Sequence, residues 1–511
     1  MSLPRCLFKR ITFFIILSYS LGYTHRSSSL FAAPVAIVGW PILEVDRHTP
    51  PSWLGDEPVL GRLICPPVSR LNLSKKSSEG LIFHKVTASK QKSGLTWTYY
   101  MRSGIYWWNG EAVTPHDLKH FIDKQISSVI KDKGAGLWEI PSYYLTTNSS
   151  SVSITWKKEP VFGPYFLNGV SLWRRNPAAP KNSDLRQFTY ECAGIYRPIV
   201  KDDGILLEPT KGYRVYRRSL FFADSKEAVK SQPKSQSLTF EMPDSFSTDP
   251  AKRPPDKKAY CPNPVNTPFV TAISWNLEQK QLRDTRFRYI LTSLTPRGSL
   301  LRAGAGFAGE LQSSLIPRNH PGYQPKVLVR PFDLEASSKE LTKLGYIRPQ
   351  GDKVRLDLSK APLKLNLISN RETPDLLEKV LADTYMAVGI NVQYLSNKSP
   401  SKSQVDGVVT GIYLPWPEMN FLGHFHSSQK SQFPFWNTGT KKLDRELEEY
   451  AISLTKAKPD FNKLQNIHTQ LYSLEPVTVI MQHKTCLHIA SKEKLKHIDV
   501  RDPDWFRKII L

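Results

Sequence analysis

The sequence predicts a multi-domain α/β protein, and three observations lead to this prediction. The chain has 511 residues, of which 40% are hydrophobic, so it can bury two or three separate cores. It contains 12 Trp, 21 Tyr and 23 Phe, which supply enough apolar surface to exclude a disordered chain. The stretch 363–395 is typical of a βαβ unit, because "LKLNLIS" and "NVQYL" flank a helical segment, "TPDLLEKVLADTYMAVG".

The N-terminus indicates export. Arg5, Lys9 and Arg10 precede the apolar run "ITFFIILSYSLG", and small residues follow in "SSSLFAAP". This order is typical of a secretory signal peptide, so we expect residues 1–32 to be removed, with cleavage after Gly22 as the alternative. The apolar run is too short to span a bilayer, and a buried N-terminal strand or helix is the other interpretation. No Cys follows the run closely, so we expect no lipid anchor and place the mature protein in the periplasm.

Four cysteines remain after the signal peptide: Cys65, Cys192, Cys261 and Cys486. None has the CxxC spacing of a zinc site, so the sequence suggests neither a metal nor any other cofactor. An even number of cysteines in an oxidising compartment permits one or two disulfides, and buried free thiols are the alternative. The sequence does not reveal which cysteines would pair.

The formal net charge is +24, from 70 Lys and Arg against 46 Asp and Glu. These basic residues are scattered, whereas nucleic-acid-binding proteins usually concentrate them on one face or helix. We therefore expect no nucleic-acid partner. The charge predicts a solvated basic surface that attracts anionic lipid or polysaccharide.

The stretch 94–123, "GLTWTYYMRSGIYWWNGEAVTPHDLKHFID", is predicted to be a hairpin followed by a helix. Asn109-Gly110 is a strong turn signal. Thr114 is a good N-cap and Pro115 suits the first helical position, and an apolar stripe follows at helical spacing. Alternation would place Tyr106 and Trp108 on one face and Trp107 on the other.

Other segments predict elements of both kinds. We expect strands at 34–40, 151–157 and 269–278, and a hairpin whose turn is Asp203-Gly204. Helices are predicted over 285–303, over 333–344 with a stop at Gly345, and twice within 441–475 before a final strand. The Pro/Ser/Lys-rich stretches 225–237 and 247–264 are predicted to be exposed connections.

The order of these segments resembles one family, the bacterial extracytoplasmic solute-binding proteins of the peptide/nickel type, which serve ABC importers. The stretch 94–117 is similar to the family's strand–turn–helix signature at Gly94, Arg102, Gly104, Trp107 or Trp108, Gly110, Thr114 and Asp117. The strand stretch 193–214 resembles another family motif at Gly194, Tyr196, Pro209 and Tyr213. "SWNLEQKQLRDTRFRYIL" resembles a third at Asn276, Asp284, Arg286 and Arg288, and further matches follow in family order across about residues 40–495.

The resemblance implies a fold of the type II periplasmic-binding-protein kind. Two α/β lobes would close around a ligand, with a hinge near Phe269–Asn276 and an extra α+β domain on the first lobe. By segment order, the first lobe would comprise residues 33–70, 192–271 and 488–511. The extra domain would be 71–191 and the second lobe 272–487. A pocket between lobes is the expected ligand site.

Candidate ligand contacts follow from the same resemblance. Peptide-binding members carry a "G-W-x-x-D" segment whose aspartate pairs with the peptide amino terminus. Here "GIYLPWPEMNFLGHF" keeps Gly411, but Pro415 occupies the aspartate position, and Glu418 is the nearest substitute. The full set of expected ligand-binding residues is Gly411, Tyr413, Trp416, Glu418, Trp436, Trp275 and Asn276.

Other groups of residues give weaker indications of function. His424-Phe425-His426 would place two imidazoles on one face of a strand, but no third ligand is evident nearby, so we expect no metal site. His483, Cys486 and His488 alternate near a terminal strand and are expected to have a structural role. The sequence has no GxSxG, HExxH or glycine-rich phosphate loop, so we expect no catalytic residues and no enzyme activity.

We therefore expect a monomeric solute-binding protein that captures a peptide or peptide-like solute and delivers it to an ABC permease in the inner membrane. The alternative is an envelope protein that keeps this fold but binds a polyanion or protein partner through its basic surface.

Overall fold

The structure is a computed structural model. It describes residues 35–38, 64–92, 94–176, 188–201, 204–210, 220–223, 238–241, 264–304, 309–369, 376–396, 402–429 and 440–489. The predicted signal peptide and Trp436 lie outside these residues. No helix in these ranges is long and apolar enough to cross a membrane.

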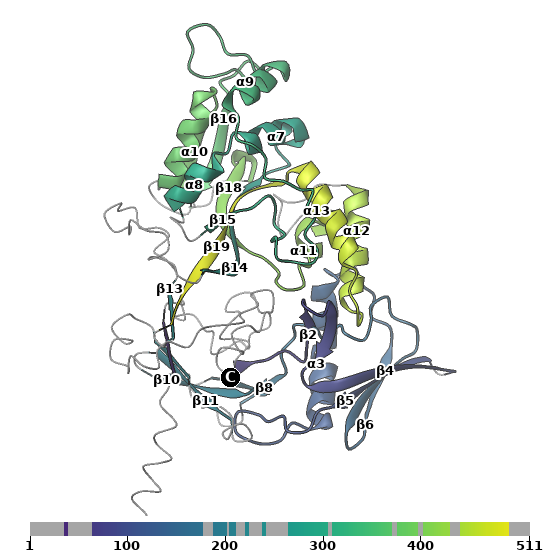
Figure 1. Ribbon diagram of the computed structural model, residues 1–511. Coiled ribbons are helices and arrows are strands. Elements are labelled where there is room, and N and C mark those ends of the chain that lie inside the picture. The colour runs from purple at the N-terminus through teal and green to yellow at the C-terminus, as the bar shows by residue number, and fades with distance from the viewer. Residues whose placement is uncertain are drawn as a thin grey trace, which may run out of the picture.

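The largest feature of the described part is an eleven-stranded sheet with the order β10-β11-β12-β1-β13-β19-β14-β18-β16-β17, to which β15 adds by pairing with β19. Its strands are β1 (Val35–Val38), β10 (Tyr196–Lys201), β11 (Gly204–Pro209), β12 (Leu220–Ala223), β13 (Leu238–Glu241), β14 (Pro264–Trp275), β15 (Gly309–Leu311), β16 (Lys364–Ser369), β17 (Asn391–Ser396), β18 (Gly407–Tyr413) and β19 (Val477–Ile489). Figure 1 shows β10 and β11 at one end of the molecule and β16 at the other, with the long β14 and β19 between them. We call β1 and β10–β13 the first-lobe strands.

The two long strands are where the sheet passes from one end to the other. β14 pairs with β19 through Pro264–Asn266 and again from Val270 onward, and the register shifts between these stretches. Pro268 lies in the irregular stretch and has no N–H to donate to a ladder. The predicted strand at 269–278 is confirmed as far as Trp275, where β14 ends. It pairs with β18 from Phe269 to Trp275, and its register against β19 shifts a second time between Thr271 and Ala272.

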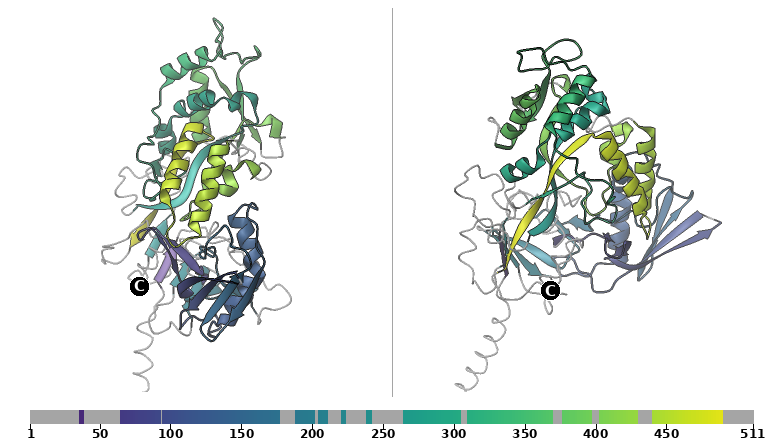
Figure 2. Two further views of the ribbon diagram at one scale, coloured as in Figure 1. Left: turned by 90° about the vertical axis from the view of Figure 1, so that its right-hand side faces the viewer. Right: turned by 45° about the horizontal axis from the view of Figure 1, so that its top comes forward.

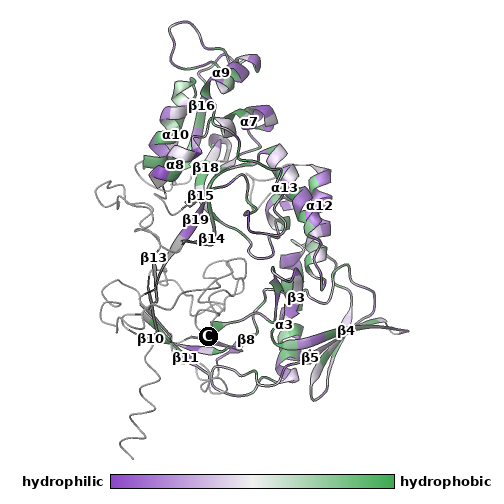
Figure 3. Cartoon of the chain, viewed as in Figure 1, coloured by the Kyte–Doolittle hydropathy of each residue, from purple (hydrophilic) through white to green (hydrophobic). Residues whose placement is uncertain are grey.

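A separate four-stranded sheet with the order β4-β5-β7-β6 lies within residues 83–156. Its strands are β4 (Phe83–Gln91), β5 (Gly94–Met101), β6 (Tyr143–Thr147) and β7 (Ser151–Trp156), and helix α3 (Pro115–Lys133) packs on β6 and β7. The helix start is as predicted, because Thr114 and Asp117 form a reciprocal capping box. Both hydrophobic and hydrophilic colours appear on α3 in Figure 3, as expected for a helix with one buried stripe.

The predicted turn at Asn109-Gly110 is confirmed, but the hairpin that it closes is small. Trp107 N–H donates to Glu111 O, Tyr106 and Ala112 form an antiparallel bridge, and Gly110 has a left-handed conformation. β5 is not part of this hairpin: it pairs with β4, from which only two residues separate it, and with the more distant β7. Trp107 and Trp108 are both buried, although they point in different directions. Trp107 belongs to the main hydrophobic core, and Trp108 packs against Phe188 and Tyr190.

The predicted βαβ unit is confirmed. β16 and β17 are parallel neighbours, and α10 (Leu376–Ala387) connects them. Around them lie α6 (Lys280–Arg283), α7 (Thr285–Ser293), α8 (Arg297–Gly304) and α9 (Leu334–Lys343). These elements enclose one hydrophobic core that includes Trp275, Phe287 and Tyr385. The Asp203-Gly204 hairpin is likewise confirmed by the register of β10 against β11.

The C-terminal helices are also as predicted. α12 (Lys441–Leu454) and α13 (Phe461–Leu474) pack together and precede β19, and the short α11 (Leu422–Phe425) contacts α12. Figure 2 shows α12 and α13 beside the β14–β19 crossing, above the part of the chain that contains α3. The remaining short elements are β2 (Ser69–Asn72), β3 (Ser77–Gly80), β8 (Trp173–Arg175), β9 (Tyr190–Cys192), η5 (Lys402–Gln404) and η6 (Ser427–Gln429).

One disulfide joins Cys65 to Cys192, with 5.2 Å between their Cα atoms. This pairing resolves the alternative between disulfide and free thiols for these two residues. The bond closes a 127-residue separation in the chain. Cross-linking so large a loop removes conformational freedom from the unfolded chain, worth on the order of 5 kcal/mol in the chain-entropy treatment.

Candidate functional site

The candidate site is built on β18 and the loop that follows it. Gly411 pairs with Thr271 of β14, and a Cβ atom at Gly411 would lie 2.1 Å from the ring of Phe269. Gly411 is exposed and has no side chain, and the ring of Phe269 occupies the position that a side chain at 411 would take. Tyr413 pairs with Phe269 through the backbone, and its side chain lies outside the described residues. Glycine is therefore needed at 411 to let an aromatic ring approach β18.

The loop after β18 turns sharply. The Trp416–Pro417 peptide bond is cis, and Met419 has a left-handed backbone conformation with φ of 50°. Met419 N–H donates to Pro415 O at 2.6 Å, which closes the turn. Trp416 is only partly buried, and it packs against the main hydrophobic core.

His320 supports this loop from the inside. Its Nε2 lies 2.9 Å from Pro417 O, and Gly322 N–H donates to its Nδ1 at 3.0 Å. Because Nδ1 accepts, the ring is in the Nε2–H tautomer and donates to the Pro417 carbonyl. Burial lowers the pKa of His320 to about 4, which keeps the ring neutral. Its ring also contacts Trp416 edge to face, with 5.4 Å between ring centroids.

Glu418 is a partly buried carboxylate. Its Oε1 atom is buried and accepts no hydrogen bond from any residue in the described ranges. Its backbone carbonyl accepts from the Tyr450 hydroxyl at 2.7 Å. Lys133, at the end of α3, interacts electrostatically with Glu418. Burial lowers the pKa of Lys133, and the negative charge of Glu418 opposes that shift. A carboxylate oxygen without a donor is costly, so Glu418 is a group with unused acceptor capacity.

Trp275 and Asn276 need a correction. Trp275 is fully buried, and its Nε1–H donates to Thr478 Oγ1 at 2.8 Å. The Asn276 side chain is 1% exposed, and its Nδ2 donates to Val405 O at 2.8 Å. Side chains with no accessible surface present nothing to a solute in this conformation. These two side chains hold β14 against its neighbours and are not available to a solute in this conformation.

The expected strand at His424-Phe425-His426 is also corrected. Leu422–Phe425 is a short helix, so positions 424 and 426 do not share a face as they would on a strand. His426 lies 2.8 Å from Ser428 Oγ and 2.9 Å from Glu448 Oε1. Within the described ranges, no group of three or more His, Cys, Asp or Glu side chains is placed to hold a metal ion.

His483, expected to have a structural role near a terminal strand, lies on β19. It is 2.7 Å from Thr271 Oγ1, and its ring contacts Phe269 with 4.7 Å between centroids, a pairing that the sequence did not predict. The alternation of "FVTAIS" places Phe269 and Thr271 on one face, so this face could have been predicted. No signal in the sequence indicates His320, because its partners at 416 and 417 are distant in the chain.

Comparisons with known proteins agree with this architecture. The family model for bacterial extracellular solute-binding proteins, family 5, matches residues 84–433. No curated protein sequence matches significantly.

Solved structures match over most of the chain. NikZ of Campylobacter jejuni, solved with Ni(L-His), has 16% identity and a TM-score of 0.64, covering 91% of this chain and 95% of its own. NikA of Brucella suis, solved with Fe(III)-EDTA, has 13% identity and a TM-score of 0.68, covering 92% and 99%. The oligopeptide-binding protein AppA of Bacillus subtilis, solved with a nonapeptide, has 14% identity and a TM-score of 0.60, covering 92% and 97%.

These observations define a solute-binding protein with a mixed α/β fold of the type II periplasmic-binding-protein kind. The chain belongs to the bacterial extracellular solute-binding proteins, family 5. The similar proteins of known structure are solute-binding proteins rather than enzymes.

Proposed function

We propose that this protein is the extracytoplasmic substrate-binding component of an ABC transporter. It captures a peptide or peptide-like solute in a cleft between its two lobes and delivers it, as a monomer, to a permease in the inner membrane. A secretory signal peptide at residues 1–32 would direct it to the periplasm. Family membership is the observation that carries this proposal.

The loop after β18 is the proposed contact surface in the second lobe. The exposed backbone at Gly411 can pair with an extended peptide, as sheet edges do with peptide ligands. Trp416 offers a partly exposed side chain, and Glu418, which is also only partly buried, would bring a carboxylate to this surface. Tyr413 and Trp436 complete the proposed set.

A thermal-shift experiment tests the proposal. Mature protein would be heated with peptides of three to nine residues and, separately, with Ni(L-His)₂, since similar proteins were solved with both kinds of ligand. Peptides should raise the melting temperature of wild type and of Tyr144→Ala, which removes an exposed aromatic ring of β6. They should have a smaller effect on Trp416→Ala. A response to the nickel complex alone would contradict the peptide assignment.

The net charge of +24 favours a second candidate, an envelope protein that binds a polyanion. This candidate predicts retention on heparin or anionic vesicles that weakens steeply as salt is raised. Absence of retention at low salt would eliminate it.

A further inference from the structure

One face of the four-stranded sheet β4-β5-β7-β6 is buried, and the other face is open. Trp97 and Tyr99 of β5 and Ile154 of β7 belong to the main hydrophobic core, together with Phe121 of α3. Figure 1 shows α3 along one side of this sheet. Because side chains alternate along a strand, the residues between these buried positions point to the opposite side. We call that side the hydroxyl face.

Two rows of hydroxyl-bearing residues cross the hydroxyl face. The register of the strands defines the rows, because paired residues of antiparallel strands lie about 5 Å apart on the same face. The first row consists of Ser89, Thr96, Thr155 and Tyr144, and the second of Thr87, Thr98, Ser153 and Thr146. Strand propensity favours Thr and Tyr, but it does not account for the two serines. Hydroxyl groups at every position of both rows therefore call for a further reason.

The outer members of the rows are exposed. Tyr144 is 48% exposed, and Ser89 and Thr146 are exposed as well. None of these three hydroxyl groups has a hydrogen-bond partner among the residues that the structure describes. Of the two rows, Thr155 is the one fully buried member. The outer hydroxyls can therefore bind a group that is not part of the chain.

The central members hydrogen bond to one another across β5 and β7. Thr96 Oγ1 lies 2.9 Å from Thr155 Oγ1, and Thr98 Oγ1 lies 2.9 Å from Ser153 Oγ. A hydroxyl offers one donor and two acceptor positions, so a bonded pair still holds one free proton and three free lone pairs. Thr98 and Ser153 are both partly exposed, so this capacity is open to a ligand in the middle of the face.

The alternating strand positions that form the hydroxyl face include no acidic residue. The other side chains at these positions of β4, β5 and β7 are Lys85, Gln91, Tyr100 and Ser151. Lys85 lies over the ring of Tyr100, with 5.7 Å from Nζ to the ring centroid. The face is therefore uncharged except at this end, where it is positive.

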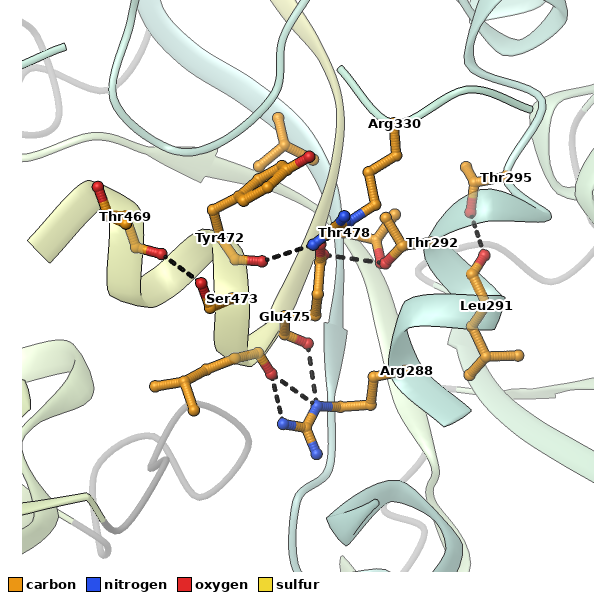
Figure 4. Close-up of polar contacts among 12 residues, drawn as sticks. Arg288, Leu291, Thr292, Thr295, Arg330, Thr469, Tyr472, Ser473, Glu475 and Thr478 are labelled. Carbon is orange, nitrogen blue, oxygen red and sulfur yellow. Dashed lines mark hydrogen bonds and ion pairs between the residues drawn. The ribbon is translucent and has the colours of Figure 1, made fainter. Parts of the chain in front are cut away.

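The polar side chains around Glu475 are used differently. Arg330 pairs with the Glu475 carboxylate, and Arg288 donates to the backbone carbonyls of Leu474 and Glu475 (Figure 4). Thr292 Oγ1 donates to Glu475 Oε2 at 3.1 Å. These groups bind one another and hold the fold together, whereas the outer hydroxyls of the two rows have no such role.

We propose that the hydroxyl face binds a glycan chain. Sugar hydroxyl groups donate to and accept from the two rows, and the exposed ring of Tyr144 packs against the apolar side of a sugar ring. A row that crosses four strands is about 14 Å long, which suits a chain of sugar rings better than a single sugar. This surface is separate from the proposed solute site, and the inference does not depend on which solute the protein carries.

The chemistry of the face favours a glycan over a protein or a membrane. The core of a protein interface is rich in aromatic residues and depleted in serine. A membrane surface is bound by exposed apolar side chains or by clustered Lys and Arg. Neither set is present in the two rows, whereas hydroxyl groups that both donate and accept match those of sugars. A glycan that carries acidic groups meets no carboxylate on this face, and Lys85 attracts it.

Co-sedimentation with purified peptidoglycan sacculi tests the proposal. Mature protein should pellet with the sacculi, and raising the salt concentration should weaken retention by no more than about threefold, because the contacts are mostly uncharged. Retention should persist on glycan strands whose stem peptides have been removed, and in the presence of excess soluble peptide. Steep loss of retention with salt would assign the binding to the basic surface instead. Release by peptide, or dependence on the stem peptides, would assign it to the solute site; any of these results, or no retention, would overturn the proposal.

Two variants test whether the hydroxyl face makes the contact. Thr98→Val combined with Ser153→Ala removes both members of a hydrogen-bonded pair, so neither is left without its partner. Tyr144→Ala removes the exposed ring. Each variant should weaken retention on sacculi about tenfold. Thr469→Val removes an exposed hydroxyl that bonds only within α13, to Gln465 O, and should bind as wild type does.

Tyr144→Ala keeps the proposal testable if the double variant is unstable. It changes an exposed residue, so its melting temperature and its thermal shift with solute should match those of wild type. Loss of retention with an unchanged solute response would separate the glycan surface from the solute site. Wild-type retention in Tyr144→Ala would contradict the proposal.

Discussion

Four neutral histidines should make the protein sensitive to mild acid. Burial lowers the pKa of His320, His424 and His483 to about 4 and that of His468 to about 3, from an ordinary value of 6.5. The side chains of His320, His468 and His483 are at most 6% exposed. The unfolded chain binds a proton at each of them below pH 6.5, whereas the folded chain does not bind one until the pH falls to about 4. Stability is therefore lost as the pH falls through this window.

The magnitude follows from the same values. Between pH 7 and pH 5 each histidine should cost about 2 kcal/mol of unfolding free energy, so the four together cost about 7 to 8 kcal/mol. This is comparable with the whole stability of a typical domain. Burial raises the pKa of Glu475 and of Asp406, and these two groups act in the opposite direction, favouring the folded state as the pH falls.

Urea unfolding followed by tryptophan fluorescence at pH 7, 6 and 5 measures this loss. His468 accepts from Gln324 N–H and lies against Ser314 Oγ, so His468→Gln removes one of the four titrating histidines. The variant should be less stable at pH 7 but should lose about 2 kcal/mol less than wild type between pH 7 and pH 5. The exposed His116, replaced in the same way, should leave the slope unchanged. Equal pH dependence in wild type and His468→Gln would refute the reasoning.

Three further predictions concern individual contacts. Trp275→Ala should cost about 3–5 kcal/mol of stability because it empties a fully buried site, and a melting temperature equal to wild type would show that Trp275 is exposed. Arg330→Met should cost about 3–5 kcal/mol because it leaves Glu475 buried without its ion-pair partner, which chemical denaturation would measure against the exposed-site control Arg302→Met. Alkylation of the unfolded but unreduced protein should leave Cys65 and Cys192 unmodified, and peptide mass spectrometry that found either one alkylated would contradict the disulfide.

Local signals in the sequence were sufficient for most elements of the fold. The helix start at Thr114-Pro115, the stop at Gly345 and the βαβ unit at 364–396 all depend on residues within one or two turns of each other. The two neighbours of β5 differ in this respect. β4 is separated from β5 by only two residues and lies within the reach of local reasoning, whereas β7 at 151–156 is distant in the sequence and could not be predicted in the same way.

The candidate site was less predictable than the fold, because burial decides which side chains a solute can reach. Motif matches placed Trp275 and Asn276 among the ligand contacts, but matching a family position does not reveal whether a side chain points into the core. Gly411 could be located from its motif, whereas its physical reason, the ring of Phe269 across β18, requires the register of two strands that are distant in sequence. The support of Trp416 by His320 depends on tertiary packing alone.

Native mass spectrometry of protein purified from its own host tests the central claim most directly. If the protein is the binding component of a peptide importer, a fraction of it should carry extra mass that dissociates on activation and fragments as peptides. The same preparation of Trp416→Ala should carry less of it. Protein that is free of bound solute in its native host, or whose extra mass is only an anionic polymer removed by salt, would contradict the proposed function.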